Sequence, residues 1–230
     1  MAIVLVIGAN RGIGLEFTKQ YLSRGDQVIA TYRNGSVADE LNHLSATNAK
    51  LNLFTLDVSS KESLSTFPSK LNEMPIDLFI NNAGVYGPRD SVFGNVDEDN
   101  WLSVLRINSI APLLLTQLII ENLRKGEVKK LIYVTSKMGS IDDNKGGGAY
   151  VYRSSKAALN AIVKSVAVDL SSEGFTTAVL HPGWVQTDMG GPNALINVQT
   201  SVSGMVSVIE KLSSEDSGSF LNYDGSVIPW

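Results

Sequence analysis

The sequence contains no cysteine and only two histidines, His43 and His181. The absence of cysteine excludes a disulfide scaffold, thiolate metal ligands and a cysteine nucleophile. Two imidazoles cannot form a multi-histidine centre, so we expect no metal. Charged residues make up only 18% of the chain, and its net charge of -4 provides no broad basic face for a nucleic acid.

Long apolar runs are also absent. A membrane span needs roughly 18 apolar residues, and Asn108, Pro112 and Gln117 are among the residues that interrupt the most apolar segment, 107–120. The apolar start of the chain lacks the basic segment of a signal peptide and is broken at Gly8. We therefore expect a cytoplasmic protein with no membrane partner.

The 230 residues, 43% of them hydrophobic, predict a single domain over residues 1–230 with a sizeable core. Short, unbroken Val, Ile and Leu runs alternate with longer segments of helical spacing. Strands buried on both faces have such runs, which is typical of a parallel sheet covered by helices. The predicted fold class is α/β, with a doubly wound, seven-stranded parallel sheet and helices on both faces.

In such a sheet, ligands bind beyond the carboxyl ends of the strands, so the residues that follow each strand are the first candidates for a site. The predicted strands are Ile3–Ile7, Gln27–Tyr32, Leu51–Leu56, Leu78–Asn81, Lys130–Thr135, Thr176–Leu180 and Phe220–Asn222. The predicted helices are Gly12–Ser23, Val37–Ser45, Lys61–Glu73, Glu98–Arg124, Val151–Glu173 and Ser201–Leu212.

A glycine-rich turn follows the first strand, with the spacing G-x-x-x-G-x-G before a helix. Its first glycine permits a tight turn, the second lets a pyrophosphate approach the backbone, and the third lets the helix pack close to the strand. The helix start adds free N–H groups and a positive dipole end. We predict a dinucleotide site here, with a purely structural turn as the alternative. The turn residues assigned to this site are Gly8, Asn10, Arg11, Gly12, Ile13 and Gly14.

The end of the second strand favours NADP over NAD. An acidic residue there would bind the ribose 2′-OH and repel a 2′-phosphate, but the chain continues as Tyr32-Arg33-Asn34 without a carboxylate. Arg33 can form a bidentate contact with a phosphate, and Arg11 can approach the same group. The alternative is a pair of solvated surface arginines.

The third and fourth strands end in further candidates. Asp57 and Val58 follow the third strand, where Asp57 could accept a hydrogen bond from the adenine amine or could instead cap a turn. Asn82, Ala83 and Gly84 close the fourth strand, and the small residues allow a close backbone approach. We expect Asn82 to be mostly structural, and Ala83 and Gly84 to line the cofactor.

Tyr152 and Lys156 are four residues apart in a predicted helix, so their side chains share one face. A phenol is a weak acid at neutral pH, with a reference pKa near 10. A nearby ammonium favours the phenolate, so we expect Lys156 to lower the pKa of Tyr152 and prepare it for proton transfer with a carbonyl oxygen. A chance surface pair is the alternative.

Two more polar residues lie near this pair in the predicted fold. Ser136 follows the fifth strand and could hydrogen-bond a substrate carbonyl, or cap a turn instead. Asn108 interrupts an apolar helix, and its amide needs a partner, either a neighbouring backbone group or a bound water. His181 precedes a proline and is expected to be structural.

Taken together, these motifs resemble the short-chain dehydrogenase/reductase family over almost the whole chain, in the family's order. The segments 181–191 (HPGWVQTDMGG) and 220–230 (FLNYDGSVIPW) are similar to those of sniffer-type and C-factor-like carbonyl reductases. The resemblance implies a Rossmann fold and NADP(H) as cofactor. It also implies a homodimer or homotetramer formed through long helices, for which the segment 107–120 is a candidate interface or, equally, core.

The resemblance also implies a role for each matching residue. Tyr152 is the general acid/base, and Lys156 lowers its pKa and holds the nicotinamide ribose. Ser136 orients the substrate carbonyl, and Asn108 holds a water in a proton relay. The cofactor-binding segment after the sixth strand contributes Pro182, Gly183, Val185 and Thr187, the last two at the nicotinamide carboxamide.

The chain departs from the family pattern in three places. Ile7 stands where the family usually has threonine, which removes a hydroxyl that ties the glycine turn to a neighbouring strand. The long gap between Ser136 and Tyr152 predicts that loop 141–149 borders the active site, and the short segment after Thr187 implies an open site. Candidate pocket walls, with core packing as an equal alternative, are Tyr86, Trp101, Trp184 and Met189.

Two functions remain open from the sequence. The first is an NADPH-dependent oxidoreductase that reduces an aldehyde or ketone to an alcohol by hydride transfer, with Tyr152 as proton donor. The alternative is a non-catalytic NADP-binding signalling or regulatory protein on the same fold, because fold does not decide function. An epimerase or dehydratase would need a larger substrate domain than this chain has.

Overall fold

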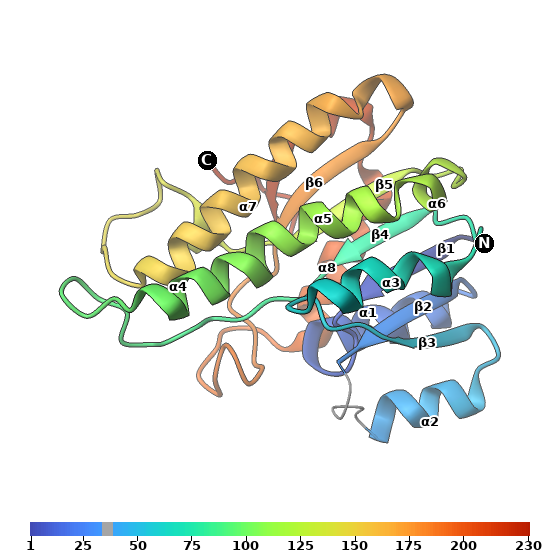
Figure 1. Ribbon diagram of the computed structural model, residues 1–230, viewed down its shortest axis with the longest axis horizontal. Coiled ribbons are helices and arrows are strands. Elements are labelled where there is room, and N and C mark those ends of the chain that lie inside the picture. Colours follow the sequence, from blue (N-terminus) through green and yellow to red (C-terminus); the bar gives the residue numbers. More distant parts are fainter. Residues whose placement is uncertain (34–38) are drawn as a thin grey trace.

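The computed structural model describes residues 1–33 and 39–230, and it contains a parallel sheet sandwiched between helices (Figure 1). Within these residues the sheet has seven strands in the order β3-β2-β1-β4-β5-β6-β7. All seven predicted strands are confirmed, with ends that differ by at most one residue. They are β1 Ile3–Ile7, β2 Gln27–Tyr32, β3 Leu51–Thr55, β4 Leu78–Asn81, β5 Lys130–Val134, β6 Thr176–His181 and β7 Ser219–Asn222.

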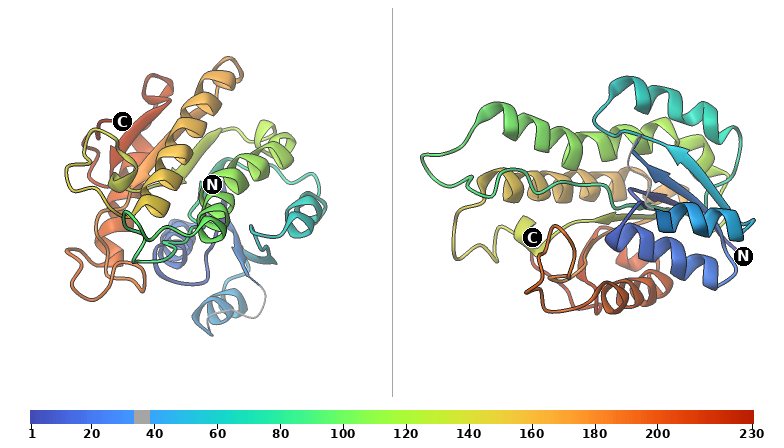
Figure 2. Two further views of the ribbon diagram at one scale, coloured as in Figure 1. Left: turned by 60° about the vertical axis from the view of Figure 1, so that its left-hand side comes forward. Right: turned by 90° about the horizontal axis from the view of Figure 1, so that it is seen from below.

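Helices cover both faces of the sheet, as a doubly wound fold requires, and the right-hand view of Figure 2 shows the strands between two helical layers. Helices α1, α2 and α8 contribute to the apolar cluster on one face, and α3, α5, α6 and α7 to the cluster on the other. The bounds are α1 Gly12–Ser23, α2 Asp39–Thr47, α3 Lys61–Leu71, α4 Glu98–Leu105, α5 Ala111–Leu118, α6 Ile120–Arg124, α7 Tyr150–Asp169 and α8 Val198–Lys211.

The unbroken apolar runs of the strands follow from this burial on two sides. In β1, Val4 and Val6 pack into the cluster of α1 and α8, whereas Leu5 and Ile7 pack into the cluster of α3, α5 and α7. Successive side chains of a strand point to opposite faces, so a strand covered on both sides needs apolar residues at every position. The predicted α/β fold class is therefore confirmed.

The predicted helix Glu98–Arg124 is not continuous. It consists of α4, a π-helical turn at Arg106–Ile110, α5 and α6. Pro112 stands in the first turn of α5, where a proline is tolerated, and Ile119 departs from helical geometry at φ -106° and ψ 12°. Periodicity predicted one helix because a π turn keeps the apolar spacing almost intact while it shifts the register by one residue.

Two other helix predictions need comment. The predicted start of the second helix at Val37 lies outside the described residues, which resume at Asp39. The predicted helix Val151–Glu173 begins one residue earlier and ends at Asp169, followed by a short 3-10 turn and by Gly174 at φ +81°. Glycine accepts this left-handed conformation without strain, as expected for a helix terminus.

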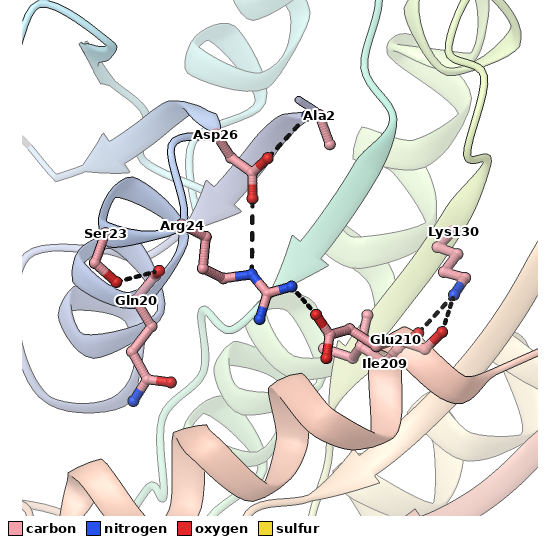
Figure 3. Close-up of polar contacts among 8 residues, drawn as sticks. All are labelled: Ala2, Gln20, Ser23, Arg24, Asp26, Lys130, Ile209 and Glu210. Carbon is pink, nitrogen blue, oxygen red and sulfur yellow. Dashed lines mark hydrogen bonds and ion pairs between the residues drawn. The ribbon is translucent and has the colours of Figure 1, made fainter.

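The amino-terminal edge of the sheet is held by a polar network (Figure 3). Asp26 accepts a hydrogen bond from the backbone N–H of Ala2 at 2.9 Å, and Arg24 forms ion pairs with Asp26 and Glu210. These contacts join the starts of β1 and β2 to the end of α8. The charged residues at this edge thus link elements of the fold, so a ligand site is expected at the opposite, carboxyl edge.

Lys130, the first residue of β5, completes the same network. Its ammonium donates to the backbone carbonyl of Ile209 at 2.6 Å and to that of Glu210 at 3.2 Å (Figure 3). These carbonyls belong to the last turn of α8, where the intrahelical hydrogen bonds run out. A cation at a helix C-terminus is also favoured by the helix dipole.

We expect Lys130→Met to lower the free energy of unfolding by about 1–3 kcal/mol, because the apolar stem remains while the charged hydrogen bonds are lost. Urea denaturation followed by circular dichroism measures this change. Lys211→Met is the matched control, since it removes an exposed lysine from the same helix end, and should cost less than about 0.5 kcal/mol. Equal losses in both variants would contradict the capping role.

Candidate active site

A cavity of about 520 Å³ opens at the carboxyl edge of the sheet. It lies where the strand order reverses, because β1 is followed by β2 on one side and by β4 on the other. Ligands of doubly wound sheets bind at such a switch point. Fifteen of the predicted catalytic and cofactor-binding residues line it: Gly8, Asn10, Arg11, Gly12, Ile13, Arg33, Asp57, Val58, Asn82, Ala83, Gly84, Tyr152, Lys156, Pro182 and Thr187.

The other predicted catalytic and cofactor-binding residues are not part of this lining. They are Gly14, Asn108, Ser136, Gly183 and Val185, none of which lines the cavity. Two of the five shape the backbone instead. A Cβ at Gly14 would lie 2.1 Å from the carbonyl oxygen of Gly8, and Gly183, at φ +85°, would place one 2.7 Å from the side chain of Ile196.

The glycine turn is tied to both neighbouring strands. The backbone N–H of Gly8 donates to the hydroxyl of Thr31 at 3.2 Å, and the side-chain amide of Asn82 donates to the carbonyl of Gly8 at 2.9 Å. Ile7 has no hydroxyl with which to hold the turn to a neighbouring strand. The hydroxyl of Thr31 in β2 therefore makes such a connection. Asn82 has the structural role expected for it and also lines the cavity.

This turn forms a cradle that suits a phosphate group. A Cβ at Gly8 would lie 3.1 Å from the Cα of Ala83, so the backbone of the first turn approaches that of β4 closely. Arg11 is the N-cap residue of α1, and its side chain makes no capping hydrogen bond. The first N–H groups of α1 thus face the cavity with the positive end of the helix dipole, a common anion site.

The two predicted phosphate-binding arginines both line the cavity. Arg11 forms an ion pair with Asp188, which follows β6, so this contact bridges the two sides of the cavity mouth. The pKa of Asp57 is lowered by a hydrogen bond from the side chain of Ser59, with smaller effects from the Ser59 backbone and the charge of Arg33. Asp57 is thus a turn residue and also part of the cavity wall.

Asn108 lies in the π-helical turn and is fully buried. Its side-chain amide donates to the carbonyl of Val85 at 2.8 Å and to the hydroxyl of Ser155 at 2.9 Å, and its carbonyl accepts from the N–H of Val85 at 2.9 Å. The sequence left open whether this amide would contact a neighbouring backbone group or a bound water. The contacts seen here are with protein groups. Asn108 therefore clamps the segment after β4 against α7.

Tyr152 and Lys156 lie on the inner face of α7, exposed by only 6% and 5%. The ammonium of Lys156 donates to the carbonyl of Val134 at 3.1 Å and lies 5.9 Å from the centre of the Tyr152 ring. Ser136 hydrogen-bonds the Tyr152 side chain. The structure thus brings together the three side chains that the sequence placed on a strand end and a helix.

Burial dominates the acid–base properties of this pair. It raises the pKa of Tyr152 to about 12, against which the hydrogen bond with Ser136 acts only partly, and it lowers the pKa of Lys156 to about 8. Both shifts disfavour the charged form, as loss of hydration does. The expected lowering of the Tyr152 pKa is therefore wrong in direction, because loss of hydration is the largest effect on this phenol.

The candidate pocket walls divide into two groups. Met189 lines the cavity, and Tyr86 stacks on Tyr152. Trp101 and Trp184 instead donate their indole N–H groups to Ser154 and to the carbonyl of Gly190. The loop 141–149 borders a second cavity of about 310 Å³ against the outer face of α7, rather than the larger cavity.

Sequence reasoning missed several residues of the cavity wall: Ser59, Val85, Ile107, Gln186 and Asp188. Ser59, Val85, Gln186 and Asp188 each follow a strand within a few residues, so the rule that sites form beyond strand ends could have included them. Ile107 could not be found in this way, because it reaches the cavity from the π-helical turn.

In the described ranges, no group of three histidine or acidic side chains could hold a metal ion. Over the same ranges, no helix is both long and apolar enough to span a bilayer.

Comparisons with known proteins agree with this geometry. A family model described as short chain dehydrogenase matches residues 2–195. The C-signal protein of Myxococcus xanthus is 46% identical over 167 residues, which are 73% of this chain and all of that protein. Two solved structures are similar along their whole length. An NADPH-bound carbonyl reductase from chicken fatty liver has 36% identity and a TM-score of 0.92, and the match covers 100% of this chain and 99% of that one. The carbonyl reductase Sniffer of D. melanogaster has 32% identity and a TM-score of 0.93, with full coverage of both chains. On this evidence, the chain belongs to the short-chain dehydrogenase family.

Proposed function

We propose that this protein reduces an aldehyde or ketone to an alcohol with NADPH. The observation that carries the proposal is a buried tyrosine, Tyr152, hydrogen-bonded to Ser136 and one helical turn before Lys156, at the wall of a cavity that begins at a glycine turn. The carbonyl reductases among the similar structures support the same chemistry.

The residues along the cavity fit a dinucleotide. The glycine turn and the first N–H groups of α1 would hold its pyrophosphate, and Arg11 and Arg33 would contact a 2′-phosphate. Lys156, at the other end of the wall, would hold the nicotinamide ribose. NADPH, when bound, supplies the hydride. The side chains of the protein therefore need to provide only binding, orientation and the proton.

Tyr152 is suited to donate that proton. With a pKa of about 12, its phenol is protonated at neutral pH and can donate to the carbonyl oxygen as the oxygen gains negative charge. Ser136 would hold the same oxygen in place. Lys156, with a pKa of about 8, is mainly an ammonium at neutral pH and would stabilise the phenolate left behind.

Tyr152→Phe should lower kcat for carbonyl reduction by about 10²–10⁴-fold, the usual contribution of a general acid. NADPH should still bind, because the ring remains. The measurements are NADPH oxidation by absorbance and NADPH binding by fluorescence titration. Tyr150→Phe is the matched control, since Tyr150 is 40% exposed and lies outside the cavity wall. Near-full activity of Tyr152→Phe would refute the proposed function.

Arg33→Ala should weaken NADPH binding by about tenfold or more, because a charge-assisted phosphate contact is lost. NADH binding should change little, since NADH lacks the 2′-phosphate. Fluorescence titration with both cofactors measures the difference. Arg124→Ala serves as control, because Arg124 pairs with Glu121 and Glu173 on the surface. Equal affinities of the unmodified protein for NADPH and NADH would contradict the assignment.

The pKa of Lys156 predicts how NADPH use depends on pH. Because the folded protein holds this pKa near 8, rising pH converts the ammonium to an amine, and kcat/KM for NADPH should fall above about pH 8. Lys156→Met should lower kcat/KM at every pH and remove this inflection. Steady-state kinetics from pH 6 to 10 provides the test, and an unchanged inflection in Lys156→Met would assign it to another group.

The alternative of a non-catalytic NADP-binding regulatory protein has one observation in its favour, the 46% identity to C-signal. The intact set of Asn108, Ser136, Tyr152 and Lys156 favours the enzyme, because a protein that only binds a nucleotide does not need a buried acid. Tight NADPH binding without turnover of any aldehyde or ketone in a broad panel would support the alternative.

Self-association of the chain is also part of the proposal. Within the segment 107–120, Ala111 and Leu115 are buried in the core. Ile110, at the end of the π-helical turn, and Leu114 and Leu118, on α5, are 45%, 37% and 41% exposed and follow one another at helical spacing. Part of the segment is therefore core, and its exposed apolar stripe would pair with a second copy in a homodimer or homotetramer.

A further inference from the structure

The ring of Tyr152 does not stand alone in the site. Tyr86, in the segment after β4, lies almost parallel to it, with ring centres 4.4 Å apart and planes at 24°. The guanidinium carbon of Arg89 lies 5.3 Å from the centre of the Tyr86 ring. Because Tyr152 occupies one face of Tyr86, the other face is left to Arg89. The three side chains form a stack that ends on the proposed proton donor.

The backbone around Tyr86 is held at several points. Val85 is clamped by the Asn108 amide, as described above. Gly87, at φ +77°, turns the chain, and a Cβ there would lie 2.8 Å from the side chain of Val104 in α4. Further along, the carbonyl of Ser91 accepts from the N–H of Tyr150 at the start of α7 at 3.1 Å. The ring of Tyr86 is therefore presented to Tyr152 by a fixed support.

Arg89 connects this support to the opposite wall of the cavity. One of its guanidinium nitrogens, Nη2, donates to the carbonyl of Met189 at 2.9 Å, and Met189 lines the cavity after β6. The turn made by Gly87 and Pro88 brings Arg89 back over the ring that precedes it. A single exposed side chain thus joins the segments after β4 and β6 beside the phenol.

We propose that Tyr86 and Arg89 are positioning residues for proton transfer by Tyr152: the Tyr86 ring fixes the plane of the phenol, and the Arg89 charge lets that ring face the phenolate. The proposal rests on the proposed function. It concerns residues that act through Tyr152, without contact to the reacting atoms.

The electrostatics of the stack explain why both residues are needed. A tyrosine ring has a negative face, so Tyr86 alone opposes the negative charge that Tyr152 gains when it gives up its proton. A cation over the far face of Tyr86 is attracted to the ring and offsets its negative potential. Arg89 therefore offsets the repulsion between the Tyr86 ring and the Tyr152 phenolate, while the Tyr86 ring still orients the phenol.

Tyr86→Leu tests the ring, with Tyr86→Phe as the conservative rescue. We expect Tyr86→Leu to lower kcat for carbonyl reduction about tenfold, which corresponds to a modest loss of orientation, while KM for NADPH changes less than about twofold. Tyr86→Phe, which keeps the stacked ring, should recover most of kcat. An equal loss in Phe and Leu variants would overturn the role of the ring, because it would point to the hydroxyl.

Arg89→Met tests the charge without altering either tyrosine ring of the stack. Alcohol oxidation with NADP needs the phenolate, so its kcat rises with pH, and removal of the cation should move that inflection to higher pH by roughly half a unit. Arg89→Lys should restore part of the shift. An inflection that stays in place in Arg89→Met would overturn the electrostatic role. Because Arg89 is exposed, Arg89→Met should fold normally. It therefore tests the proposal even if Tyr86→Leu does not fold.

Phe93→Ala is the matched control for the same segment, since Phe93 is 90% exposed and outside the stack; its kcat and pH profile should equal those of the unmodified protein. Tyr152→Phe separates the two proposals. If it abolishes turnover while Tyr86→Leu and Arg89→Met leave kcat and the inflection unchanged, the stack is refuted and the proposed function stands. If Tyr152→Phe remains active, the proposed function fails.

Discussion

The site depends on one buried charge, the ammonium of Lys156. Burial lowers its pKa, and its hydrogen bond to the carbonyl of Val134 provides a partner at the very end of β5. That bond helps to hold α7 against the sheet, and Tyr152, one turn earlier, lines the same cavity. The phenol shares the desolvated environment, so the two groups remain neutral acid and protonated amine at neutral pH, a combination suited to proton donation.

The rest of the carboxyl edge is held together around this pair by close glycine approaches and by side-chain amides. Gly14 lets α1 approach the carbonyl of Gly8 closely, and the side-chain amide of Asn82 donates to the same carbonyl, so the glycine turn, the segment after β4 and α1 meet at this point. On the far side, the π-helical turn aims Asn108 at Val85 and Ser155. The amino edge is different: there Arg24 and Lys130 join strands to α8. The charged residues that join strands to α8 thus lie at the amino edge of the sheet, whereas those of the proposed site lie at its carboxyl edge.

Tyr86 and Arg89 extend this arrangement across the cavity mouth. Their stack on Tyr152 and the bond from Arg89 to Met189 connect the segments after β4 and β6 with the first turn of α7. Arg11 makes a second connection across the mouth through Asp188. The proposed sites of proton transfer and of nucleotide binding are therefore each flanked by an arginine that reaches the short segment after β6.

The sequence by itself determined the seven strands, the α/β class and most of the residues around the cavity, because buried parallel strands need unbroken apolar runs and their ligands collect at strand ends. It did not reveal the π-helical turn, because the apolar periodicity is preserved when the register shifts by one residue. It also did not reveal the hydrogen bond between the Thr31 hydroxyl and the glycine turn. It predicted the wrong direction for the pKa of Tyr152, because spacing places an ammonium nearby but does not report burial. The Tyr86 stack was likewise decided only in three dimensions, where Gly87 and Asn108 set the path of the chain. Local spacing is written in the sequence, whereas desolvation and contacts between distant loops arise only when the chain is packed.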